Sequence, residues 1–76
     1  MKTHRIKIYF SKHIWDVYIN ERDYFRLSAQ LPRGKERLTV YTIGTGSFAT
    51  TILLINWDCV ECIDFRADEN SKDIEV

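Results

Sequence analysis

The sequence predicts a small all-β domain: an antiparallel sheet, or an SH3-like or other small β-barrel, of five to six strands with one short helical turn near residues 57–61. Three observations favour this fold class. Short stretches alternate apolar and polar residues with the period of two that is typical of strands. Turn signals separate these stretches. A central segment, residues 38–57, carries no charged side chain over twenty positions. We expect a single β domain over residues 1–66 of the 76, followed by an acidic, flexible tail over residues 67–76.

Two strands are predicted before the first ambiguous segment. Residues 4–10 and 14–20 both alternate apolar and polar side chains, as Ile6 and Ile8 show in the first of them. The polar break at residues 11–13 is short enough for a hairpin. The N-terminal segment is therefore expected to form two antiparallel strands.

The segment that follows supports two interpretations. As a strand, residues 25–31 alternate apolar and polar positions without a fault. As a helix over residues 21–31, which would make the fold α+β, Asn20 would be the N-cap and Asp23 would stand near the capping-box position. The regular alternation favours the strand, and Pro32 ends either element.

The uncharged central segment is predicted to be a hairpin of two strands, residues 38–44 and 48–55. Nine of its twenty residues are polar or glycine, which argues against a membrane span. The turn signal Gly44-Thr45-Gly46-Ser47 lacks the lysine and the following helix of a phosphate-binding loop. The continuous apolar run over residues 52–55 predicts that both faces of the second strand are covered.

The pair Cys59-x-x-Cys62 is the sharpest short motif. Two thiolates on one turn can supply half of a zinc ligand set, and His4 and His13 are candidates for the other half. A single pair is a weak signal, however, and the two histidines lie nine positions apart. A redox dithiol is disfavoured because acidic residues surround the pair and a strand follows it. We expect two small buried or semi-buried thiols without a metal or cofactor, and a zinc-stabilised domain that uses Cys59 and Cys62 is a less favoured alternative.

Charge is distributed unevenly along a chain whose net charge is zero. Residues 1–37 hold nine basic and four acidic side chains, giving +5, whereas residues 58–76 hold two and seven, giving −5. Charged residues throughout the first seven positions argue against a leader peptide. Two closely spaced cysteines without a leader suggest a reducing compartment, so the expected location is cytoplasmic.

No combination of residues predicts catalysis, so we expect a protein that is not an enzyme and that acts through a surface. The favoured function is a protein-binding module, regulatory or inhibitory, or a subunit that associates with itself. Binding of single-stranded nucleic acid by a small β-barrel is the alternative, disfavoured by the neutral net charge; a membrane partner is not expected. The expected binding residues come from a basic loop (Arg33, Lys35, Arg37), from the uncharged hairpin tip (Thr45, Ser47, Phe48) and from the polar face of the first strand (Lys7, Tyr9).

Overall fold

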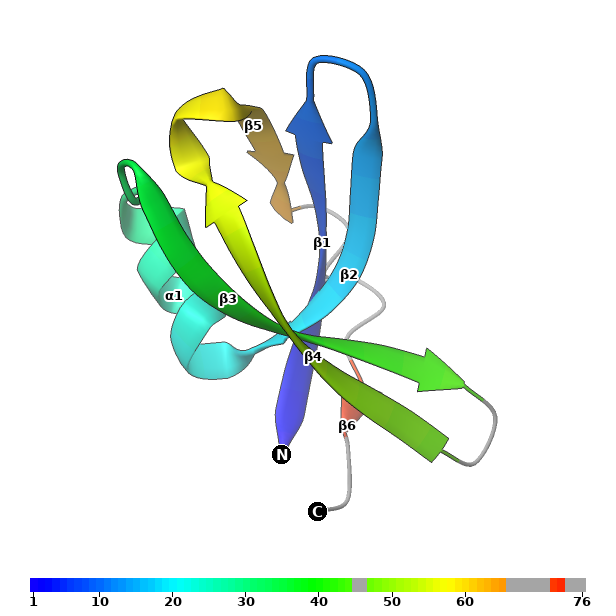
Figure 1. Cartoon of the computed structure of the whole chain (residues 1–76). Helices are drawn as coiled ribbons and strands as arrows, with labels where there is room; N and C mark the ends of the chain where they lie inside the picture. Colours follow the sequence, from blue (N-terminus) through cyan, green and yellow to red (C-terminus); the bar gives the residue numbers. More distant parts are fainter. Residues whose placement is uncertain (45–46, 66–71, 74–76) are drawn as a thin grey trace.

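The computed structural model describes residues 1–44, 47–65 and 72–73, which form one antiparallel sheet and one helix (Figure 1). The elements are, in chain order, β1 (Lys2–Phe10), β2 (Ile14–Asn20), α1 (Glu21–Ala29), β3 (Lys35–Gly44), β4 (Ser47–Asn56), the 3₁₀ turn η1 (Trp57–Cys59), β5 (Val60–Asp64) and β6 (Lys72–Asp73). The strand order is β4-β3-β2-β1-β5, and β6 pairs with β1. The prediction of a small all-β fold with a helical turn near residues 57–61 is confirmed.

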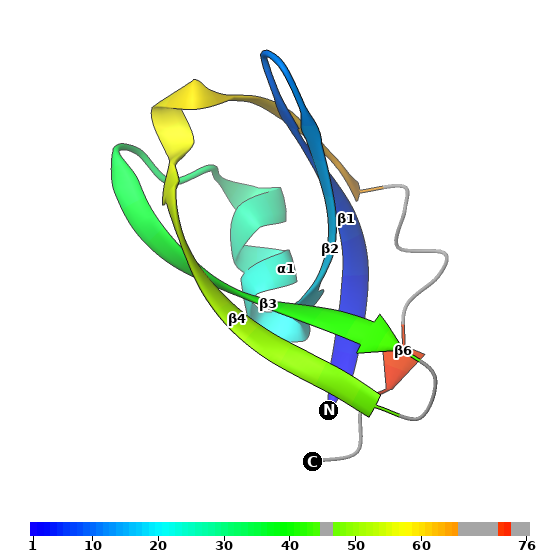
Figure 2. The same ribbon diagram turned by 45° about the vertical axis from the view of Figure 1, so that its right-hand side comes forward.

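The core lies on the concave face of this sheet, which curls around α1 (Figure 2). In β1 the alternate residues Ile6 and Ile8 are fully buried, and Ile19 of β2 is buried beside them. Alternation with period two turns the intervening residues toward the outer, convex face. The buried apolar side chains are Ile6, Ile8, Ile19, Leu27, Leu38, Val40, Ile55 and Trp57.

The segment after β2 is a helix, so the favoured prediction of a strand over residues 25–31 is wrong and the alternative of a helix is correct. The side chain of Asn20 accepts a hydrogen bond from the backbone N–H of Asp23 at 2.7 Å, which makes it the N-cap. Leu27 is buried against the sheet. The cap and this packing outweigh the strand-like alternation, because most helical stability in proteins comes from tertiary contacts.

Two hydrogen bonds from Trp57 of η1 join the end of β4 to the start of β3 at the base of the hairpin. The backbone N–H of Trp57 donates to the carbonyl of Gly34 at 2.8 Å, and its indole Nε1 donates to the carbonyl of Glu36 at 3.2 Å. Gly34 has φ of 67°, a conformation that favours glycine. β3 begins at Lys35, so the predicted basic loop is shorter than expected: Lys35 and Arg37 lie on the strand.

The predicted hairpin over the central segment is confirmed, with β3 and β4 paired from Lys35–Asn56 to Gly44–Ser47. The prediction that both faces of β4 are covered is wrong. Ile55 is buried, but Ile52 and Leu54 are each 65% exposed. They point to the outer face of the sheet, over which the described residues place no second layer.

The expected tail over residues 67–76 lies outside the described residues apart from β6, which pairs with Lys2 and Thr3 of β1. In the described part of the chain, no helix is long and apolar enough to cross a membrane.

Candidate functional site

One edge of β4 is free in the described sheet. β4 stands at one end of the strand order, and β3 is its only neighbour within residues 1–44, 47–65 and 72–73. Its ten residues present a row of backbone N–H and C=O groups on the side away from β3. Such a row can pair with a strand of another chain.

An apolar row of three side chains follows this edge on the outer face of the sheet. Phe48, Ile52 and Leu54 are 38%, 65% and 65% exposed, and their even spacing places them on one face. We call these three residues the apolar row. Across the hairpin they stand opposite Ile43, Thr39 and Arg37 of β3. The apolar row therefore lies open to a partner while the other face of β4 carries the buried Ile55.

The distal half of β4 is exposed on both of its faces. Tyr18 of β2 pairs with Tyr41 of β3, and β2 contributes no further pair to β3 in the described residues. Beyond that point β3 and β4 continue as a two-stranded arm that extends away from the rest of the sheet (Figure 1). All residues from Ser47 to Ile52 are exposed, including those that would face a core in a covered sheet. A hairpin without a covering layer is marginally stable by itself, so contact with a partner would stabilise it.

The predicted basic and uncharged binding residues lie at opposite ends of this hairpin. Arg37 stands opposite Leu54 near the base, whereas Phe48 stands opposite Ile43 near the tip. At about 3.4 Å per residue the two ends of this stretch of β3 are about 20 Å apart. Lys35 and Ser47 are exposed at the base and the tip respectively.

The remaining predicted residues have different positions. Arg33 is exposed in the connection before β3 and borders a hollow of about 410 Å³ between this connection, α1 and β3. Thr45 lies outside the described residues. Lys7 and Tyr9 lie on the outer face of β1, which β2 separates from β3. The structure therefore places Arg33, Lys35, Arg37, Ser47 and Phe48 on or beside the hairpin, and Lys7 and Tyr9 apart from it.

The outer face around β1 mixes opposite charges. Lys7 is the register partner of Asp16 on β2 and of Asp64 on β5. The guanidinium of Arg5 donates to both carboxylate oxygens of Asp16, with an Nε to Oδ1 distance of 2.8 Å. This hydrogen bonding lowers the pKa of Asp16 and raises the pKa of Arg5. The nearby basic side chains therefore stand beside acidic ones and do not form a purely positive surface.

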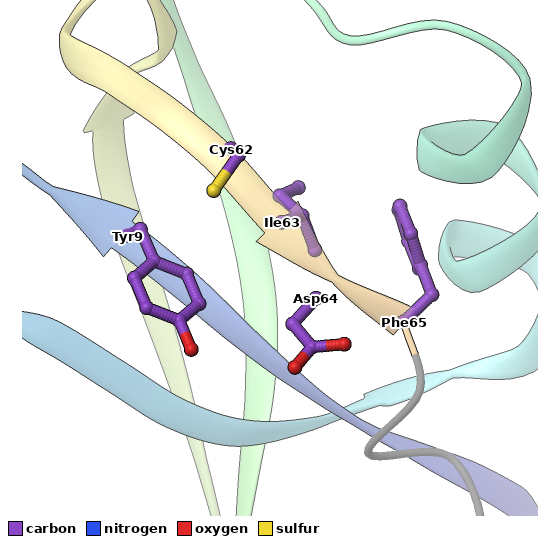
Figure 3. A pocket seen from close by; sticks show the side chains of 5 residues that line it. All are labelled: Tyr9, Cys62, Ile63, Asp64 and Phe65. Carbon is purple, nitrogen blue, oxygen red and sulfur yellow. The ribbon is translucent and has the colours of Figure 1, made fainter.

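Two hollows interrupt the outer face. One, of about 390 Å³, is lined by Tyr9, Cys62, Ile63, Asp64 and Phe65 at the β1–β5 edge (Figure 3). The Tyr9 hydroxyl and the Asp64 carboxylate lie on the same side of the two strands (Figure 3). The other, of about 290 Å³, lies between β2 and β3 and is lined by Arg5, Asp16, Tyr18, Tyr41, Thr42 and Ile43. Both are open depressions beside the strands.

The candidate zinc ligands are not brought together. Cys59 and Cys62 are exposed free thiols, so the expectation that they are buried or semi-buried is wrong; they lie on a turn and an edge strand that nothing in the described residues covers. His4 is buried beneath α1, where its Nε2 lies 3.1 Å from a carboxylate oxygen of Glu21, and His13 stacks on the ring of Phe10. Within the described ranges no group of three His, Cys, Asp or Glu side chains could hold a metal ion.

Ile52 and Leu54, the most exposed residues of the apolar row, were not among the residues expected to bind. A signal for them was present in the sequence. The short hairpin connection sets Ile52 opposite Thr39 and Leu54 opposite Arg37. Since polar Thr39 and Arg37 alternate with apolar Leu38 and Val40, the face that they share with the apolar row is the solvent face.

Comparisons of the chain with family models, with curated proteins and with solved structures gave no match.

Proposed function

We propose that this protein is a small cytoplasmic protein-binding module, regulatory, inhibitory or self-associating, that acts through the β3–β4 hairpin and not by catalysis. The observation that carries this proposal is the apolar row on a free strand edge that has no charged residue. Charged side chains on an edge strand normally discourage pairing with other chains, and β4 has none. A partner strand added to β4 would form backbone hydrogen bonds and cover the apolar row.

Burial of Ile52 and Leu54 by a partner would supply part of the free energy of binding. Full burial of an Ile or Leu side chain is worth about 1.5–3 kcal/mol. Ile52 and Leu54 are each 65% exposed, so covering them would contribute about 1–2 kcal/mol apiece by the same relation. Added backbone hydrogen bonds and the ordering of the distal arm would set the rest of the affinity.

A lysine substitution in the apolar row tests this function. Purified Ile52→Lys and wild-type protein are immobilised, and the proteins that each retains from cell extract are quantified by mass spectrometry. Ile14→Lys is the matched control because Ile14 is 54% exposed on β2, away from the hairpin. We expect wild type and the control to retain the same proteins and Ile52→Lys to lose them. Retention of the same proteins by all three would refute binding through the apolar row.

Single-stranded nucleic acid binding is a second candidate, favoured by one observation. Lys35, Arg37 and Tyr41 alternate along the outer face of β3, so two basic groups and an aromatic ring share one surface. The chain has no net charge to strengthen such binding. Fluorescence anisotropy with a mixed-sequence oligonucleotide at low salt tests this candidate, and absence of binding there would exclude it.

A further inference from the structure

We propose that the partner at the β4 edge is β4 of a second copy of this chain, paired antiparallel about a twofold axis at Thr51. This inference rests on the proposed function, because it uses the same strand edge and the same apolar row. It adds the identity of the partner, the symmetry and the register of pairing.

The charge of β4 suits pairing with itself. A twofold axis places each side chain near the axis beside its own copy, so any charge there would meet a like charge and destabilise the pair. β4 carries no charged residue, and the charged residues of β3, Lys35, Glu36 and Arg37, lie at the base, away from Thr51. The opposite edge of the strand order is different, since β5 carries Glu61 and Asp64 within five residues. Self-pairing is therefore electrostatically permitted at β4 and opposed at β5.

Hydrogen-bond geometry limits the registers that are possible. Gly44 and Ser47 close the hairpin across a two-residue connection, and such a closing pair is a hydrogen-bonded one. The ladder alternates, so the pair of Val40 with Thr51 is also hydrogen-bonded toward β3. The backbone groups of Thr50 and Ile52 then point to the free edge. These outward-pointing groups belong to even-numbered residues of β4. A second copy that pairs antiparallel must therefore place its even-numbered residues opposite the even-numbered residues of the first copy.

Side-chain matching selects one of these registers. With the axis at Thr51, Phe48 stands opposite the partner's Leu54, and Thr50 stands opposite the partner's Ile52. The apolar rows of the two copies then form one continuous strip on a sheet that runs through both chains. With the axis at Ile52 instead, Phe48 would stand opposite the polar amide of the partner's Asn56. Of these two registers, the one about Thr51 is favoured because it sets Phe48 opposite an apolar side chain.

The proposed pairing uses nearly all of β4. With the axis at Thr51, residues 47–55 of the two copies lie opposite one another, a stretch of about 30 Å. Side chains on both faces of distal β4 are exposed and would contribute to the contact.

Sedimentation equilibrium of the purified protein tests the association. We expect a concentration-dependent rise from 9.0 kDa, the mass of one chain, to twice that mass and no further. Ile52→Lys is expected to weaken the association at least tenfold, and Ile14→Lys is expected to leave it unchanged. A single-chain mass for the wild type at every concentration would overturn the inference, and so would an open-ended series of larger species, because twofold pairing closes.

Disulfide trapping tests the register. Cys59 and Cys62 are exposed, so both are first replaced by Ser. In that background Thr51→Cys is expected to form a rapid intermolecular disulfide, because non-hydrogen-bonded antiparallel partners have Cα atoms about 4.5 Å apart, within the range of disulfides. Ile52→Cys is the control one residue along β4 and is expected to react much more slowly. Faster trapping through Ile52→Cys would overturn the axis at Thr51.

The two proposals can fail separately. If the purified chain is monomeric but still retains another protein from extract in a manner that requires Ile52, self-pairing is wrong and the protein-binding function stands. If the chain is monomeric and retention does not depend on Ile52, both are wrong.

Discussion

Replacement of Asn20 by alanine tests the helix that the local pattern disfavoured. The side chain of Asn20 accepts from the N–H of Asp23 at 2.7 Å, and its Nδ2 donates to a carboxylate oxygen of Asp23 at 3.2 Å. Loss of an N-cap acceptor costs about 1 kcal/mol, with a range of about 0.5–2 kcal/mol. For a chain of 76 residues each kcal/mol corresponds to about 4–8 °C in Tm. We therefore expect Asn20→Ala to unfold about 4–8 °C below the wild type.

Thermal unfolding followed by far-UV circular dichroism measures this change, with two companion variants. Asn20→Ser keeps a cap acceptor and should recover most of the stability. Asn56→Ala is the matched control, because Asn56 caps only the three-residue η1 turn and accepts from Asp58 at 3.2 Å; we expect a loss below about 0.5 kcal/mol there. Equal losses in the two alanine variants, or no loss at residue 20, would refute the helix cap.

Three further predictions concern the core, pH and the hairpin base. Ile8→Ala removes a fully buried side chain and should cost about 2–5 kcal/mol in urea unfolding, whereas Ile14→Ala, at a position that is 54% exposed, should cost below about 0.5 kcal/mol; similar losses would contradict the assigned core. The hydrogen bond from Arg5 lowers the pKa of Asp16 in the folded protein. The pair therefore stabilises the fold above the pKa of unfolded Asp, about 3.9, and this stabilisation is lost as the pH falls through the pKa of Asp16 in the folded protein. Because the pair is exposed, this loss of stability should be small. If the free energy of unfolding falls with acid in the same way in the wild type and in Asp16→Asn, the pair contributes nothing to stability. Gly34→Ala forces a side chain into φ of 67° and should cost about 1–2 kcal/mol; unchanged stability would contradict this backbone conformation.

The strands with regular alternation could be predicted from the sequence because their pattern is local. β1 and the β3–β4 hairpin follow from period-two alternation and from a turn signal between two uncharged runs. Residues 25–31 alternate equally well, yet Phe25 is 59% exposed and Leu27 is buried on a helix. The deciding interactions, the Asn20 cap and the packing of Leu27 on the sheet, are tertiary or depend on the exact start of the helix, so alternation alone pointed to the wrong element.

The candidate site could be predicted only in part. Lack of charge pointed to the hairpin and to its tip at Phe48, and this proposal remains to be tested. The exposure of Ile52 and Leu54 was not predicted, because whether an apolar strand is central or at an edge depends on the order of strands in the sheet. That order depends on pairings such as Tyr18 with Tyr41, which join residues far apart in the chain.

The hydrogen bonds at the base of the β3–β4 hairpin imply a gradient of amide exchange along it. At the base, Trp57 donates hydrogen bonds to the carbonyls of Gly34 and Glu36, and Ile55 and Leu38 are buried there. Amide hydrogens at the base should therefore exchange with solvent only through global unfolding. Amides of Ser47 to Thr51 lie in the exposed distal arm and should exchange through local opening at a much smaller free energy. Amide exchange in the distal arm therefore measures binding directly. Any partner that covers the arm should slow amide exchange there and leave amide exchange at the base unchanged.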